Sequence, residues 1–161
     1  TTYLAKAGGT MSGNITLGEN TSIALDPAGS ADGKYSGVTI SGTAGAALAF
    51  GEVCYLAAAD SRWELADADA ATTADRMLGI CVLAAAADGN ATVMLLMGTI
   101  RADTKFPALT IGSPVYVGET AGAIQVAIPT GADNVIRRVG FALTADEIYF
   151  NPSQDSQTTV A

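Results

Sequence analysis

The chain has 161 residues, of which 49% are apolar and only 6% aromatic, so its length fits one domain with a core of small side chains. Its net charge of −8, from 8 basic and 16 acidic residues, argues against a nucleic-acid partner, because phosphate binding needs clustered Lys and Arg. No apolar run approaches the roughly 20 residues that cross a bilayer, so we expect no membrane partner.

The first part of the chain, residues 1–45, is rich in Gly, Thr, Ser and Asn. Its apolar residues occur only in short alternating pieces such as residues 15–17 and 23–25. These are too few to stabilise a separate monomeric domain. We therefore predict an extended arm over residues 1–45 that is either disordered or ordered against other chains.

Strand patterns occur throughout the chain, and helix periodicity is nearly absent. Alternating or continuous short apolar runs occur at residues 38–40, 63–65, 93–97, 115–117, 124–126 and 148–150. Two alanine-rich stretches, residues 66–75 and 84–90, contain turn formers and are interpreted as loops. This pattern predicts an all-β fold, a small β-barrel or sandwich.

An internal repeat organises residues 46–151. Residues 50–56 align with residues 111–117 at an offset of 61 positions, and residues 78–80 align with residues 139–141 at the same offset. Two such units, related by a pseudo-twofold axis, can close one barrel or sandwich. We predict a duplicated β-domain over residues 46–151, followed by an extended tail over residues 152–161.

The two cysteines, Cys54 and Cys81, both lie in apolar strand-like runs. Cysteine's preference for burial favours two buried free thiols over a disulfide. Because the chain has no His, two cysteines cannot form a standard zinc site.

Catalytic patterns are missing from the sequence. Without His, the commonest general base and the Ser-His-Asp and Cys-His arrangements are excluded. The acidic residues that cluster in sequence read as a solvated surface rather than a catalytic pair or a calcium loop; they are Asp60, Glu64, Asp67, Asp69 and Asp75. We expect no enzyme activity, no cofactor and no metal site.

The stretch over residues 3–17 resembles the short repeat that opens many phage tail-fibre segments. Those segments carry the pattern Leu-x-Lys-x-Gly-x-Thr-Met-x-Gly-x-Leu before an intertwined trimeric β-shaft. The residues that follow the pattern here are Leu4, Lys6, Gly9, Thr10, Met11, Gly13 and Ile15.

A second resemblance spans roughly residues 45–151. Residues 95–100, 112–117 and 139–142 look like a small β-domain of phage capsid-decoration and head-fibre proteins, and residues 148–152 are similar to the ends of such virion proteins. The resemblance implies a homotrimer that binds the capsid lattice by one end.

Together these patterns predict a phage head decoration or head-fibre protein on the virion surface, assembled in the host cytoplasm. Its N-terminal region would attach to the major capsid protein, and the β-domain would face outward. The residues expected to make the attachment are Thr1, Thr2, Tyr3, Leu4, Lys6, Met11, Ile15 and Leu17.

Three alternatives remain open. The first is a tail-fibre or adhesin tip that binds a host glycan, for which Tyr55, Trp63 and Tyr116 are the first residues to test. The second is a depolymerase fragment with paired carboxylates, although such enzymes are usually longer. The third is a bacterial surface-layer module, against which we note that no signal-peptide pattern opens the chain.

Overall fold

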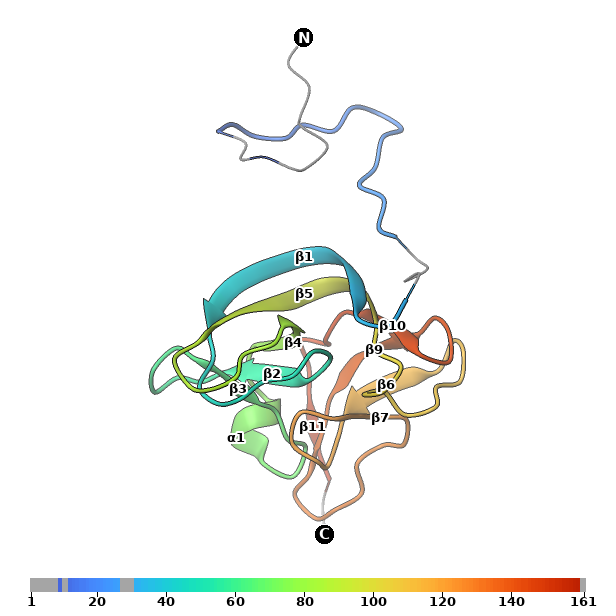
Figure 1. Cartoon of the computed structure of the whole chain (residues 1–161). Coiled ribbons are helices and arrows are strands. Elements are labelled where there is room, and N and C mark those ends of the chain that lie inside the picture. The colour runs from blue at the N-terminus through green and yellow to red at the C-terminus, as the bar shows by residue number, and fades with distance from the viewer. Residues whose placement is uncertain (1–8, 10–11, 27–30, 160–161) are drawn as a thin grey trace.

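The computed structural model describes residue 9, residues 12–26 and residues 31–159. The prediction of an all-β fold is confirmed, because strands make up 39% and helix 3% of the residues that the structure describes, and the main sheet curls into a half-barrel (Figure 1). In chain order the elements are β1 (Lys34–Thr43), β2 (Val53–Leu56), β3 (Trp63–Leu65), α1 (Ala71–Ala74), β4 (Leu78–Leu83), β5 (Ala91–Arg101), β6 (Pro114–Val117), β7 (Ile124–Gln125), β8 (Val135–Ile136), β9 (Arg138–Ala142), β10 (Glu147–Phe150) and β11 (Gln157–Thr158).

Strand β5 joins the two halves of the sheet. The strand order is β3-β2-β4-β5-β10-β9-β6-β7, with β1 paired to β5 outside this path. Strand β4 pairs with residues 93–95 of β5 and β10 pairs with residues 98–101, so the two occupy successive parts of one edge. Strand β1 pairs antiparallel along the opposite edge from Lys34 to Thr43.

The two halves of the sheet pair their strands in the same order, β3-β2-β4 and β7-β6-β9. Equivalent Cα partners stand 61 positions apart: Cys54 with Gly79 and Val115 with Gly140, and also Leu56 with Trp63 and Val117 with Ile124. The correspondence ends at Tyr116, because a bulge shifts its partner to Arg138, whereas Tyr55 in the first half pairs with Leu78. A duplication as the origin of these halves stays a prediction.

The core consists mainly of alanine, valine, leucine and isoleucine. The larger cluster packs side chains from both halves, among them Ile80, Leu95, Val115 and Phe150. A smaller cluster surrounds Trp63. Glycines make room for this indole, because a Cβ on Gly42 would lie 2.5 Å from its Nε1 atom.

The predicted boundary of the arm at residue 45 is wrong. Residues Lys34–Thr43 form β1, which pairs with β5 over its whole length. The reason is that backbone hydrogen bonds with β5, rather than burial of β1 side chains, hold this strand in the sheet. The described part of the predicted tail also contacts the domain, because β11 pairs with β8. The stretch over residues 66–75, predicted as a loop, contains the single turn α1.

Strands β1 and β5 approach most closely at two paired glycines, Gly37 and Gly98. A Cβ on Gly98 would lie 2.1 Å from the carbonyl oxygen of Ser36, and one on Gly37 would lie 2.1 Å from that of Met97. Their φ angles of 157° and 149° are also rarely adopted by residues with a side chain. Only glycine at both positions permits this pairing.

We predict that Gly98→Ala lowers the free energy of unfolding by about 3 kcal/mol or more, because the added methyl group meets backbone atoms that cannot move independently. Chemical denaturation monitored by circular dichroism measures the change. Gly18→Ala is the control, since no atom lies within 4 Å of its Cβ position. Equal stability of Gly98→Ala and the unaltered protein would contradict the inferred close pairing.

The loop between β7 and β8 is held by one carboxylate, that of Glu119. Its Oε1 accepts hydrogen bonds from the backbone N–H groups of Thr130 (2.9 Å) and Gly131 (3.2 Å) and from Nδ2 of Asn134 (2.7 Å). These donors stabilise the ionised form, so they hold the pKa of Glu119 below its ordinary value.

Folding lowers the pKa of Glu119, so the ionised carboxylate stabilises the folded state at pH values above the pKa of the unfolded chain. This stabilisation is lost as the pH falls through the lower pKa of the folded state. We predict that the melting temperature of the unaltered protein falls more steeply between roughly pH 5 and pH 3 than that of Glu119→Gln. Thermal unfolding across this range measures both slopes. Parallel pH profiles would show that Glu119 does not hold the loop.

Candidate functional site

Most of the predicted attachment residues lie outside the part of the chain that the structure describes; these are Thr1, Thr2, Tyr3, Leu4, Lys6 and Met11. The other two, Ile15 and Leu17, belong to residues 12–26, which contain neither helix nor strand. Their exposed fractions are 64% and 49%, and Ile23 is 75% exposed. This stretch extends away from the β1 side of the domain, opposite β11 (Figure 1).

Two hydrogen bonds tie the outward stretch to the centre of the sheet. The N–H of Asp26 donates to Oγ of Ser36 at 3.1 Å, and Oγ1 of Thr99 donates to the carbonyl oxygen of Asp26 at 2.6 Å. Ser36 and Thr99 are paired residues of β1 and β5, directly beside the glycine pair. Sequence reasoning missed this anchor, since Thr99 stands 73 positions after Asp26 in the chain.

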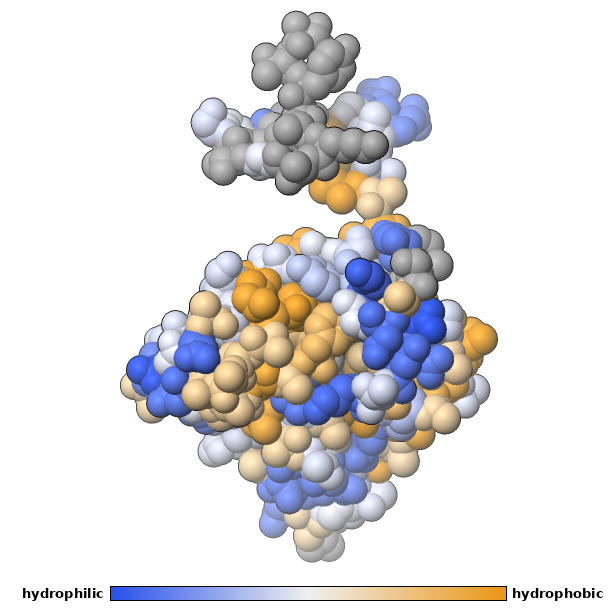
Figure 2. Space-filling model, viewed as in Figure 1, coloured by the Kyte–Doolittle hydropathy of each residue, from blue (hydrophilic) through white to orange (hydrophobic). Residues whose placement is uncertain are grey.

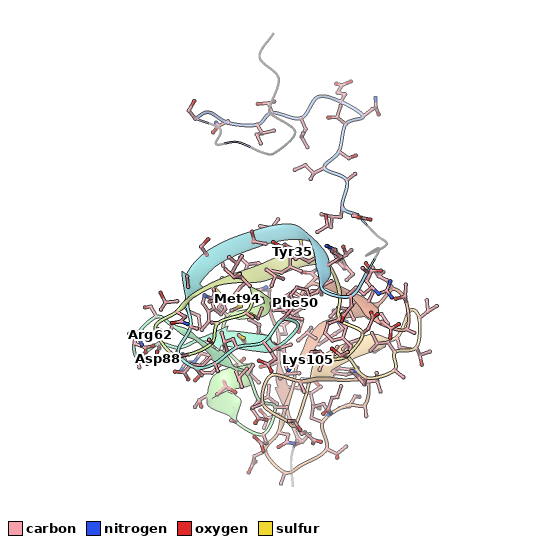
Figure 3. All side chains as sticks on the ribbon, in the orientation of Figure 1. Tyr35, Phe50, Arg62, Asp88, Met94 and Lys105 are labelled. Atoms are coloured by element: carbon pink, nitrogen blue, oxygen red, sulfur yellow. The ribbon has the colours of Figure 1, made fainter. Side chains whose placement is uncertain are left out.

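The outer edge of β1 is a second candidate contact surface. Among the residues described, β1 pairs only with β5, so the N–H and C=O groups along its other edge have no strand partner. Exposed apolar side chains accompany this edge; they are Tyr35, Val38 and Ile40 on β1 and Met97 on β5. Figure 2 shows hydrophobic atoms gathered beneath the band of β1, and Figure 3 labels Tyr35 there.

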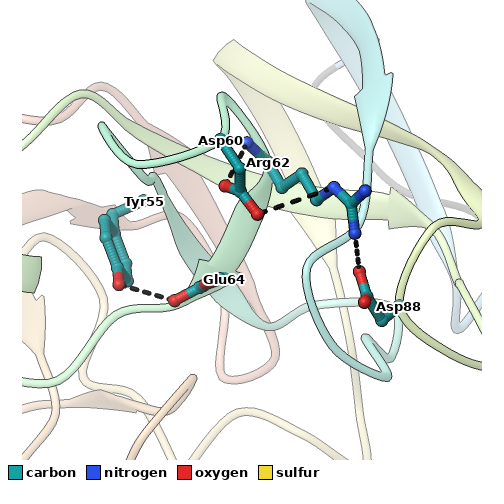
Figure 4. A network of polar contacts seen from close by, with 5 residues as sticks. All are labelled: Tyr55, Asp60, Arg62, Glu64 and Asp88. Carbon is teal, nitrogen blue, oxygen red and sulfur yellow. Dashed lines mark hydrogen bonds and ion pairs between the residues drawn. The ribbon is translucent and has the colours of Figure 1, made fainter.

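The acidic residues do not converge on one point. The Tyr55 hydroxyl donates to Oε2 of Glu64 at 2.7 Å (Figure 4), and this bond raises the pKa of Tyr55 to about 12. The Arg62 guanidinium lies 3.6 Å from Asp60 and also contacts Asp88, which joins two surface loops. These pairs are solvent-exposed, and such pairs contribute little to stability.

The remaining aspartates of this group face other partners. Oδ1 of Asp67 accepts a hydrogen bond from the N–H of Asp69 at 3.2 Å, and burial raises the pKa of Asp67. Oδ1 of Asp75 accepts from Oγ of Ser156 at 2.6 Å. Among the described residues, no three His, Cys, Asp or Glu side chains are grouped to hold a metal ion.

The three aromatic residues proposed for sugar stacking differ in access. Trp63 is only 2% exposed and belongs to the smaller core cluster, so its ring faces cannot receive a sugar. Tyr55 and Tyr116 are half-buried. Tyr116 lines a shallow hollow of about 320 Å³ together with Arg138 and Gln157.

Both cysteines are free and buried, as predicted. Burial raises the pKa of each thiol, and the nearby Glu52 carboxylate raises both further. Sγ of Cys81 also contacts the carbonyl oxygen of Leu83 at 3.3 Å. The thiols are therefore inert parts of the core that surrounds Trp63.

We predict that neither cysteine reacts with a thiol-specific reagent near pH 8 in the native protein, and that both react in denaturant. The physical reason is that the reacting thiolate is suppressed by burial. Counting labelled thiols by mass spectrometry under the two conditions tests this. Rapid labelling of either residue in the native protein would contradict the burial of both thiols.

Comparisons of this chain with family models, with curated proteins and with solved structures found no match. Within the described part of the chain, no helix has the length and apolar character to span a membrane.

Proposed function

We propose that the chain is a structural protein of the phage virion surface, a head decoration or head-fibre protein that attaches through its N-terminal region. One observation carries the proposal: Ile15, Leu17 and Ile23 expose apolar side chains on a stretch without strand partners. Apolar groups displayed in this way are stabilised when another surface buries them. The resemblance of residues 3–17 to phage fibre segments supports the same interpretation.

The β1 edge supports assembly into a homotrimer. A long strand edge with unpaired backbone groups accepts a strand or loop from another chain. The hydrogen bonds of Asp26 hold the end of the outward stretch beside β1. The stretch can therefore contact the capsid while the β1 edge contacts another copy of the chain. The net charge of −8 keeps free chains apart before assembly, which occurs in the host cytoplasm in this proposal.

A second candidate function is a tail-fibre or adhesin tip that binds a host glycan. The hollow beside Tyr116 favours it, because an aromatic residue and an arginine, Tyr116 and Arg138, both line it. Aromatic faces and charged donors are the groups that bind sugars. Trp63 does not contact the glycan in this second proposal, since its side chain is buried.

We predict that deletion of residues 1–17 abolishes attachment to particles and leaves the domain folded, because the sheet begins at Lys34. Co-sedimentation with particles measures attachment, and circular dichroism measures folding. The matched control is Ile128→Ser, which removes a side chain that is 49% exposed outside the N-terminal region.

Full occupancy of particles by the truncated chain would overturn the proposed attachment. Antibody-gold labelling of intact particles separates the two functions. Label over the head supports decoration, and label confined to the tail tip supports the adhesin. Particles without label would contradict both.

A further inference from the structure

A cleft lies between the turn after α1, the middle of β5 and the segment that follows β10. Its volume is about 530 Å³, within the range of small-ligand sites. The lining side chains include two guanidinium groups, two carboxamides, one carboxylate and apolar residues; they include Asp75, Arg76, Leu96, Arg137, Asn151 and Gln154.

Arg137 lines this cleft and is only 6% exposed. Its Nη1 donates to the carbonyl oxygens of Ala74 at 2.8 Å and Arg76 at 2.5 Å, and its Nε donates to that of Ser153 at 3.1 Å. All three acceptors are neutral. The guanidinium is therefore fixed in position by the backbone while its charge is not neutralised by these contacts.

The charge of Arg137 has no carboxylate at contact distance among the described residues, whereas Arg62, Arg101 and Lys105 each contact one. The Asp75 carboxylate attracts the Arg137 charge from beyond contact distance. Oδ1 of Asp75 already accepts a hydrogen bond from the Ser156 hydroxyl. A buried cation without an adjacent anion is unfavourable, so a carboxylate that reaches it is strongly favoured.

The rest of the lining indicates which carboxylate fits. Arg76 adds a second guanidinium, so the lining carries one net positive charge in a chain whose net charge is −8. Asn151 and Gln154 supply amide donors and acceptors of the kind that bind hydroxyl groups. Leu96 and Pro152 offer apolar surface for the C–H face of a ring.

We propose that this cleft binds a carboxylated saccharide, such as a uronic acid, whose carboxylate is held by the guanidinium groups of Arg76 and Arg137. Arg76 suits this role, because its Nε donates to the carbonyl of Thr72 and its two Nη groups can donate parallel N–H bonds to the two carboxylate oxygens. Arg137 contributes its Nη2, since its Nε and Nη1 already donate to backbone carbonyls. The carboxamides then contact the sugar hydroxyls. This site is separate from the N-terminal attachment segment and does not depend on a role in the virion.

The test is a titration of the isotope-labelled full chain, observed by NMR at the Arg Nε–H and at the Asn and Gln side-chain amides. Sodium glucuronate is the probe, and methyl glucoside is its uncharged counterpart. We expect saturable shifts at Arg137, Asn151 and Gln154 with glucuronate, with affinity in the millimolar range. Methyl glucoside should bind at least about tenfold more weakly, since each factor of ten corresponds to the loss of one good charged contact.

Arg76→Gln is the informative variant, because Arg76 is exposed and contacts Arg137 through its backbone carbonyl, which the substitution keeps. The side-chain bond that is lost goes to the carbonyl of Thr72 and not to Arg137. It should weaken glucuronate binding about tenfold. Arg62→Gln removes the same charge from a surface ion pair elsewhere and should leave the affinity unchanged.

The proposal is overturned by the absence of saturable shifts at Arg137, by equal binding of methyl glucoside, or by equal weakening of glucuronate binding in the two arginine variants. Tighter binding of N-acetylglutamate than of glucuronate would also overturn it, because the preferred ligand would then be an acidic peptide. None of these results bears on attachment by residues 1–17, so the two proposals fail separately.

Discussion

The pairing of β5 with its three neighbours is the interaction on which the rest of the structure depends. Strand β4 and strand β10 take successive parts of one edge, and β1 covers the other. Without this shared strand, the halves that contain β2 and β6 would be separate small sheets. The contact at Gly37 and Gly98 sets how closely β1 approaches, and the anchor of Asp26 stands one residue pair away.

Local patterns in the sequence predicted many strands because alternation and burial are properties of neighbouring residues. Residues 63–65 are β3 as predicted, and residues 148–150 lie within β10. Long-range pairing was not predictable in this way. The strand pattern at residues 38–40 was recognised, but the extent of β1 and its pairing with β5 were not, because β1 buries few side chains. Two of the three carbonyl groups that hold Arg137 belong to residues 63 and 61 positions earlier in the chain, so they leave no local signal.

Two kinds of surface coexist on this molecule. The outward stretch and the β1 edge expose several apolar side chains and hold few charges, which suits contacts with other chains. The cleft at Arg137 is polar and cationic, which suits a small anion. The sequence indicated the first kind through its alternating residues at positions 15–17. It gave no sign of the second, because the lining comes from four separate segments of the chain.

The unpaired edge of β1 also governs how the isolated protein behaves in solution. An edge without a partner can join that of a second molecule, and repetition of this contact leads toward aggregates. Mutual repulsion from the net charge of −8 opposes this encounter. Salt shortens the range of that repulsion to about 8 Å at physiological ionic strength. We therefore expect electrostatic repulsion to keep the free chain dispersed, and to do so best in buffers of low ionic strength.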